Sequence, residues 1–153
     1  MDGAAQWLLN NAPKGRSLLI LADNGPNFTV MTFAGWAAGM PQCPVSTTYA
    51  AFGGDFGRLK HVVAKSKPGV IYAESARALA AFQQMDIGDA LLVTSAPNAK
   101  GATQLDELIA TPVTGAVADA IASRKPDDVA AYMATSGSTG LPKLVTITFD
   151  NLA

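Results

Sequence analysis

Residues 132–143 read Tyr-Met-Ala-Thr-Ser-Gly-Ser-Thr-Gly-Leu-Pro-Lys, and this segment says more about the chemistry of the chain than all its other residues together. Backbone N–H groups of a glycine-rich turn can converge on an anion, and hydroxyl groups add further donors. A lysine adds a mobile positive charge that suits phosphate as a point-charge partner. The segment therefore predicts polyphosphate binding, and the candidate residues are Thr135, Ser136, Gly137, Ser138, Thr139, Gly140 and Lys143.

The P-loop of nucleotide triphosphatases is the obvious alternative, and the spacing excludes it. That motif requires glycine directly before the lysine, Ser or Thr directly after it, and a helix to follow. Here Pro142 precedes the lysine and Leu144 follows it. Residues 144–148 are rich in β-branched side chains, which predicts a strand. The loop is therefore expected to join two strands, with no helix dipole available to it.

The same segment resembles the phosphate-loop signature of the adenylate-forming superfamily, the AMP-dependent synthetases and ligases. That signature is a Thr/Ser-Ser-Gly-Ser/Thr-Thr-Gly-x-Pro-Lys run after an apolar or aromatic residue. Tyr132 and residues 135–143 fit it throughout, and the lead-in at residues 127–130 is also similar. Leu144 departs from it, since many members carry glycine there. The alternative is a Ser/Gly-rich hairpin turn that binds no ligand, and the length of the match favours the phosphate loop.

Other segments extend the resemblance over nearly the whole chain. Residues 37–46 resemble the helix-to-strand junction of acyl-CoA synthetases, while residues 56–63, 67–73 and 101–112 are similar to bacterial feruloyl-CoA synthases. The resemblance implies a ligase that uses ATP to turn a carboxylic acid into an acyl-adenylate and then an acyl-CoA. It implies an aromatic acid such as ferulate as the small-molecule substrate, ATP and coenzyme A as co-substrates, and Mg²⁺ beside the phosphates.

The length of the family's members implies that residues 1–153 are a partial N-terminal AMP-binding domain, truncated at the C-terminus and also at the N-terminus. The family's adenine, ribose and acid-binding residues and its catalytic lysine come later than this chain reaches. We therefore expect no catalytic residue here and no turnover by these residues alone. Two alternatives stay open: a stand-alone nucleotide- or anion-binding module, and a structural α/β domain whose loop is only a turn.

Composition narrows the class of protein. The 153 residues are 49% hydrophobic and 15% charged with a net charge of -1, which is typical of one globular domain with a buried core. The eleven Lys and Arg residues are scattered, so no nucleic-acid partner is expected. No basic leader opens the chain, and the apolar stretch 28–40 is too short to span a bilayer, so no membrane partner is expected. Cys43 is the single cysteine and is interpreted as a small buried residue. Because one cysteine cannot form an internal disulfide, the sequence predicts a protein of the reducing cytoplasm.

The hydrophobic pattern predicts an α/β fold, a largely parallel sheet flanked by helices and ending in a strand–phosphate-loop–strand element. Short apolar runs bounded by turn residues predict strands at 17–22, 43–45, 70–73 and 90–93. Helices are expected at 4–9, 26–40, from Asp55 to a stop at Pro68-Gly69, and at 75–85, 103–109 and 116–123. The helix at 26–40 is apolar nearly all round, so it is expected to be buried.

Three more residues invite a functional role. His61 is the single histidine, but no local carboxylate or serine completes a triad and nothing in the sequence places it near the loop. We therefore interpret it as structural. Asp127 and Asp128 are adjacent, so they cannot easily face one metal ion, and we interpret them as caps of a helix or strand.

Overall fold

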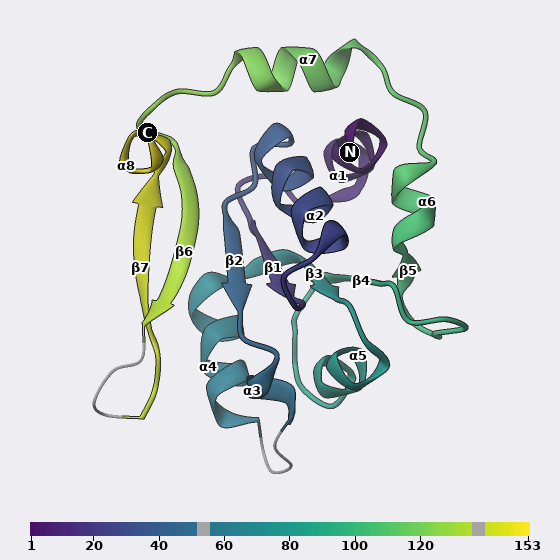
Figure 1. The fold of residues 1–153 in the computed structure, drawn as a ribbon, viewed down its shortest axis with the longest axis vertical. Coiled ribbons are helices and arrows are strands. Elements are labelled where there is room, and N and C mark those ends of the chain that lie inside the picture. Colours follow the sequence, from purple (N-terminus) through teal and green to yellow (C-terminus); the bar gives the residue numbers. More distant parts are fainter. Residues whose placement is uncertain (52–55, 136–139) are drawn as a thin grey trace.

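The computed structural model describes residues 1–51, 56–135 and 140–153 (Figure 1). Within these ranges, seven strands form one sheet in the order β5-β4-β3-β1-β2-β6-β7. All neighbouring strands run parallel except β7, which runs antiparallel to β6. The strands are β1 (Ser17–Leu21), β2 (Gln42–Val45), β3 (Pro68–Ala73), β4 (Leu91–Thr94), β5 (Thr103–Gln104), β6 (Val129–Thr135) and β7 (Lys143–Thr148). The predicted α/β fold with a largely parallel sheet is confirmed.

Helices cover both faces of this sheet, as short parallel strands require. Helices α1 and α2 lie on one face, and α4 and α5 lie on the other (Figure 1). The helices of the described ranges are α1 (Asp2–Asn11), α2 (Pro26–Ala37), α3 (Thr48–Ala51), α4 (Gly57–Ser66), α5 (Ala76–Gln83), α6 (Leu105–Ile109), α7 (Gly115–Ala122) and α8 (Phe149–Leu152). No helix among the described residues has the length and apolar character needed to cross a membrane.

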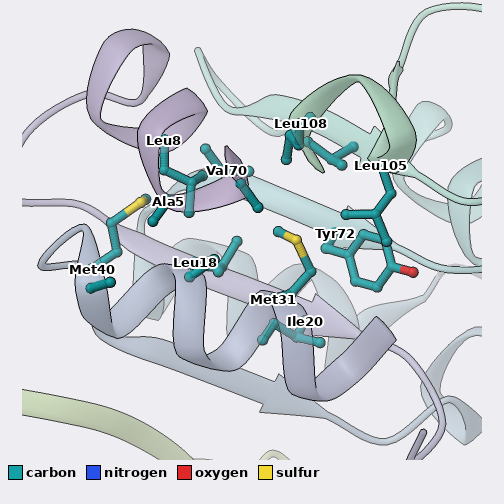
Figure 2. Packing of buried hydrophobic residues seen from close by; sticks show 14 of the residues in the cluster. Ala5, Leu8, Leu18, Ile20, Met31, Met40, Val70, Tyr72, Leu105 and Leu108 are labelled. Atoms are coloured by element: carbon teal, nitrogen blue, oxygen red, sulfur yellow. The ribbon is translucent and has the colours of Figure 1, made fainter. Parts of the chain in front are cut away.

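The central strands divide the core between the two faces. In β1, Leu18 and Ile20 pack with α1 and α2, while Leu19 and Leu21 pack on the face of α4 and α5. This alternation follows from the two-residue period of a strand. Figure 2 shows the first cluster, in which Met31 lies between the β1 side chains and Tyr72. Each fully buried aliphatic side chain contributes about 1.5–3 kcal/mol relative to exposure to water.

Close approach of α2 to β1 depends on a glycine. A Cβ atom built on Gly35 would lie 2.8 Å from Leu18 Cδ2. A carbon atom so close would force the Leu18 side chain or the helix to move, in a core that is packed without room to spare. Gly35 therefore sets the distance between α2 and the sheet.

Two expectations about the helices are wrong. Helix α2 is not buried all round, because it covers one face of the sheet and leaves Pro26, Thr29 and Phe33 on its outer side; Phe33 is 47% exposed. Pro68 and Gly69 do not end α4 but begin β3, and Lys67 ends the helix in the left-handed conformation at φ 46°. A proline is tolerated there because the first residue of a strand need not donate to the ladder. The expected cap at Asp55 lies outside the described residues.

The β6–β7 hairpin joins the sheet at its edge, beside β2 (Figure 1). Its base is held by several contacts. Trp36 Nε1 donates to the carbonyl oxygen of Ala130 at 2.8 Å, and the Trp36 ring meets Phe149 edge-on at 5.7 Å. The pairing of β6 with β2 is short, with one residue pair in register, Gln42 with Ala131. The other half of the hairpin therefore extends past β2.

Candidate functional site

The two strands of the hairpin place the ends of the predicted phosphate loop opposite each other. Thr135 ends β6, Lys143 begins β7, and these two residues are partners in the antiparallel register. Thr135 Oγ1 also donates to the carbonyl oxygen of Lys143 at 3.3 Å. The predicted strand–loop–strand element is thus confirmed, and no helix begins at Lys143, which agrees with the exclusion of the NTPase P-loop.

The predicted loop residues differ in what the structure says of them. Thr135, Gly140 and Lys143 are described, and all three are exposed. Ser136, Gly137, Ser138 and Thr139 lie outside the described residues, so their predicted role in phosphate binding stays a prediction. Gly140 has φ +89°, a conformation that residues with a Cβ rarely adopt. This glycine is therefore required by the backbone at the end of the loop.

Lys143 has the properties expected of a lysine that meets a mobile anion. Neither of the two ion pairs found among the described residues, Arg16–Asp89 and Arg124–Asp128, includes it. An exposed ammonium group on a flexible stem can reach an incoming phosphate without breaking an existing salt bridge. The described residues thus keep a positive charge available at the end of the loop.

The hairpin has two different faces. Tyr132 and Leu144 pack against the core cluster that contains residues of α4. The register pairs Met133 with Val145 and Thr135 with Lys143, and the two-residue period puts these pairs on the opposite face. That opposite face is open, since Met133 is 42% and Val145 44% exposed. The loop lysine therefore begins a strand whose one face is anchored on α4 and whose other face is free.

The expectation that His61 is remote from the loop is wrong. His61 lies on α4, and its Nε2 atom is 2.9 Å from the carbonyl oxygen of Pro142, a buried residue. The carbonyl oxygen can only accept, so His61 donates this bond. The two residues are 81 positions apart, and helix α4 contacts β7 in the folded chain. No local pattern in the sequence signals this contact.

A pocket of about 560 Å³ lies between α4 and the hairpin. It is lined by His61, Lys65, Tyr132, Pro142, Lys143, Leu144 and Thr146. Lys65 of α4 brings a positive charge to one wall, and the start of β7 at Lys143 lines the other. No local pattern in the sequence signals this pocket, because its lining comes from two segments about 80 residues apart.

The acidic pair before β6 acts in a turn. Asp128 Oδ2 accepts a hydrogen bond from the backbone N–H of Lys125 at 2.9 Å and lies 3.9 Å from Arg124 Nη1. Asp128 therefore closes the turn that precedes β6, and its bond caps neither a helix nor a strand. The described residues contain no group of three His, Cys, Asp or Glu side chains that could hold a metal ion.

Cys43 is buried, as expected, and its thiol lacks the properties of a reactive nucleophile. Burial raises the pKa of its thiol to about 11, against a smaller opposite effect of a hydrogen bond from Ser66. A thiol with a raised pKa is almost wholly protonated at neutral pH, and the thiolate is the reactive form. Cys43 therefore belongs to the core.

Sequence comparison identifies the family to which this fold and loop belong. Residues 1–153 match the family described as AMP-binding enzyme, so the chain belongs to that family. A search of curated proteins finds no match. The family assignment confirms the predicted superfamily.

Solved structures of this fold are similar over nearly the whole chain. A luciferase-like enzyme from the mealworm Zophobas morio is 16% identical with a TM-score of 0.75, over 97% of this chain and 34% of that one. Apo MatB from Rhodopseudomonas palustris is 20% identical with a TM-score of 0.68, over 99% of this chain and 28% of that one. VinN in complex with 3-methylaspartate is 20% identical with a TM-score of 0.66, over 97% and 38%. The chain thus spans about a third of the length of these structures.

Proposed function

We propose that this chain is part of the N-terminal domain of an ATP-dependent carboxylate–CoA ligase, and that its hairpin loop holds the β- and γ-phosphates of ATP. The observation that carries the proposal is the exposed Lys143 at the end of a loop whose two ends are fixed opposite each other in β6 and β7. Membership in the AMP-binding family supports it. One protein of the same fold, MatB, has been solved with ATP bound, which also supports the use of ATP.

The residues of the chain can supply the binding part of this chemistry. In the proposed reaction the substrate carboxylate attacks the α-phosphate of ATP, an acyl-adenylate forms and pyrophosphate leaves. The loop N–H groups, the hydroxyls and Lys143 hold the leaving pyrophosphate and neutralise its developing charge. Such catalysis consists of positioning and electrostatic stabilisation. The thiol of coenzyme A then takes the acyl group and AMP leaves, a step that falls to other residues of the complete enzyme.

Magnesium fits this proposal as a companion of the nucleotide. Mg²⁺ commonly binds through substrate phosphates and water with only one or two carboxylates from the protein. Hydroxyls of the loop are the groups of this chain that would lie beside the ion.

An aromatic acid such as ferulate is the finer part of the proposal. Its support is the similarity of residues 56–63, 67–73 and 101–112 to feruloyl-CoA synthases. These residues fall on α4, β3 and the β5–α6 segment. They belong to the scaffold of the described fold, so the acid must be established by experiment.

The test is ATP–pyrophosphate exchange by the complete protein with a panel of acids: ferulate, 4-coumarate, benzoate, malonate and acetate. We expect acid-dependent exchange that requires Mg²⁺, with ferulate or another aromatic acid as the best substrate. Exchange with malonate alone would keep the ligase and reject the aromatic acid. No exchange with any acid, together with saturable ATP binding by residues 1–153 at micromolar concentration, would favour a stand-alone nucleotide-binding module.

A further inference from the structure

We propose that His61 is a positioning residue, which fixes the backbone of Lys143 through its hydrogen bond to Pro142. The proposal rests on the proposed function, since it gives His61 a task only if Lys143 holds the phosphates of ATP. His61 itself needs no contact with the nucleotide. It acts through the peptide group between Pro142 and Lys143.

The loop half of the hairpin extends past the strand beside it in the sheet. The register with β2 ends at Ala131, and β6 continues for four residues to Thr135. At the rise of a strand this is about 13 Å of hairpin beyond its last partner in the sheet. The bond from His61 to the Pro142 carbonyl joins the loop half of the hairpin to α4. Tyr132 and Leu144 pack against the α4 cluster, and the directed bond from His61 fixes the position of the strand end beside the loop.

The geometry of the peptide bond connects the His61 contact to Lys143. The Pro142 carbonyl and the Lys143 N–H belong to one planar group, which also contains the Cα atoms of both residues. A donor 2.9 Å from the Pro142 oxygen therefore orients the plane in which the Lys143 Cα lies. In a trans peptide the N–H points opposite to the C=O, so the Lys143 N–H points away from His61. One hydrogen bond thus sets both the origin of the lysine side chain and the direction of its backbone donor.

Pro142 is well suited to accept this hydrogen bond. Proline has a fixed φ and no N–H, so its carbonyl is the one backbone group through which a neighbour can hold it. Pro142 is buried, and a buried carbonyl without a partner is costly. The next helix turn supports the donor, because Leu59, Val62 and Val63 of α4 are buried in the core. The ring of His61 is therefore held by a rigid element, and its partner is a rigid residue.

The test uses three variants of the complete enzyme. His61→Gln keeps an amide N–H at about the reach of Nε2, His61→Asn carries the same group one methylene shorter, and His61→Phe keeps a ring without a donor. Lys143→Ala is the reference for loss of the loop cation, and Lys60→Ala is the control for a change of charge on the exposed side of α4. The measurements are ATP–pyrophosphate exchange, thioester formation from pre-formed acyl-adenylate, and the thermal midpoint of each variant.

We expect kcat/KM for ATP in adenylate formation to fall about three- to tenfold in His61→Asn and His61→Phe, the range expected for loss of one hydrogen bond. His61→Gln should retain most of the activity, and Lys60→Ala should match the parent protein. Thioester formation from pre-formed acyl-adenylate should be unchanged in all of them. A purely structural histidine would instead lower both half-reactions together, and Gln would give no rescue.

The outcomes separate the two proposals. If Lys143→Ala impairs adenylate formation and all three His61 variants do not, His61 is no positioning residue and the proposed function stands. If Lys143→Ala has no effect either, both proposals are wrong. If His61→Phe fails to fold, the Gln and Asn pair decides, because equal activity of these two amides would overturn the inference.

Discussion

The parallel centre of the sheet and the hairpin at its edge are built on opposite principles. Every residue of β1 and β3 is buried, whereas the hairpin strands β6 and β7 carry exposed residues, which include Met133, Lys143 and Val145. The centre is stabilised by apolar side chains on both faces, so its sequence is constrained by volume. The hairpin is anchored on one face and open on the other, so its residues are available to a ligand. This difference separates the residues that support the fold from those proposed to act on ATP.

The contrast also concerns how each region is held. The central strands share register over four or five residue pairs with their neighbours, while β2 and β6 share one. Side-chain bonds take over at the hairpin, from Trp36 at its base and from His61 near the loop. A region held by a few directed bonds can be disturbed locally, and a region held by packing can be disturbed only as a whole.

The largest expected effect is therefore on folding, at the centre. Ile71 in β3 is 0% exposed, whereas Val145 in β7 is 44% exposed. We expect Ile71→Ala to lower the free energy of unfolding by about 2–5 kcal/mol, since it leaves a cavity in a packed core. Val145→Ala should change it by less than about 0.5 kcal/mol, as surface substitutions do. Urea unfolding followed by circular dichroism measures both, and equal losses would remove the distinction between the two regions.

The next effect should appear in catalysis and leave folding unchanged. Lys143→Ala in the complete enzyme should cost about 2–3 kcal/mol of transition-state stabilisation in adenylate formation, near the figure for one lost donor to developing charge. Because Lys143 is exposed, the free energy of unfolding of the Lys143→Ala variant should stay within about 0.5 kcal/mol of the parent value.

The measurement compares pyrophosphate exchange with acyl transfer from pre-formed adenylate, which should be nearly unaffected by the loss of Lys143. Lys60→Ala on the exposed side of α4 is the matched control. Equal damage to both half-reactions would give Lys143 a structural role and contradict the proposed function.

The same division explains how much could be predicted from the sequence. The central strands were predictable because a buried parallel strand must be a short apolar run, and β1 and β3 are such runs. The hairpin was predictable from β-branched residues after Lys143 and from the length of the loop motif. Both depend on neighbours in the chain, which the sequence displays directly.

What could not be predicted depends on residues distant in the chain. Nothing local indicates that His61 reaches Pro142, since a helix face shows only that one side is polar. The exposure of Phe33 was missed because composition shows that a helix is apolar, but not how many of its sides are covered. Pro68-Gly69 was misread as a helix stop because the same residues can also open a strand whose first N–H has no partner to bond.

A smaller effect is expected at the base of the hairpin. Trp36→Phe removes the donor to Ala130 and keeps an aromatic ring near Phe33 and Phe149. We expect a loss of about 1 kcal/mol in the free energy of unfolding, the usual net value of a hydrogen bond. Amide exchange in Val129–Thr135 should accelerate more than in Ser17–Leu21.

Trp7→Phe is the matched control, because the Trp7 ring packs against the cluster of α1 and α2, away from the hairpin. Uniform acceleration of exchange in all strands by Trp36→Phe would show that the hairpin and the centre unfold as one unit. Selective acceleration in the hairpin would sharpen the difference between them.

The smallest effect on stability is expected at an exposed ion pair beside the N-terminal ends of β1 and β3. Arg16 donates to the Lys67 and Pro68 carbonyls and also bonds Asp89, with Arg16 Nη2 2.8 Å from Asp89 Oδ1. The hydrogen bond from Arg16, and then its charge, lower the pKa of Asp89. A depressed carboxyl pKa adds stability above the unfolded value of about 4, and that stability is lost as the pH falls through the folded pKa. Since Asp89 is exposed and screened by salt, the free energy of unfolding of the Asp89→Asn variant should differ little from that of the parent at pH 7 and not at all at pH 2.

NMR titration of the Asp89 carboxyl should give a midpoint below that of an ordinary aspartate, and high salt should bring it back toward that value. A midpoint at or above the ordinary value would show that Arg16 is held by the two carbonyls alone.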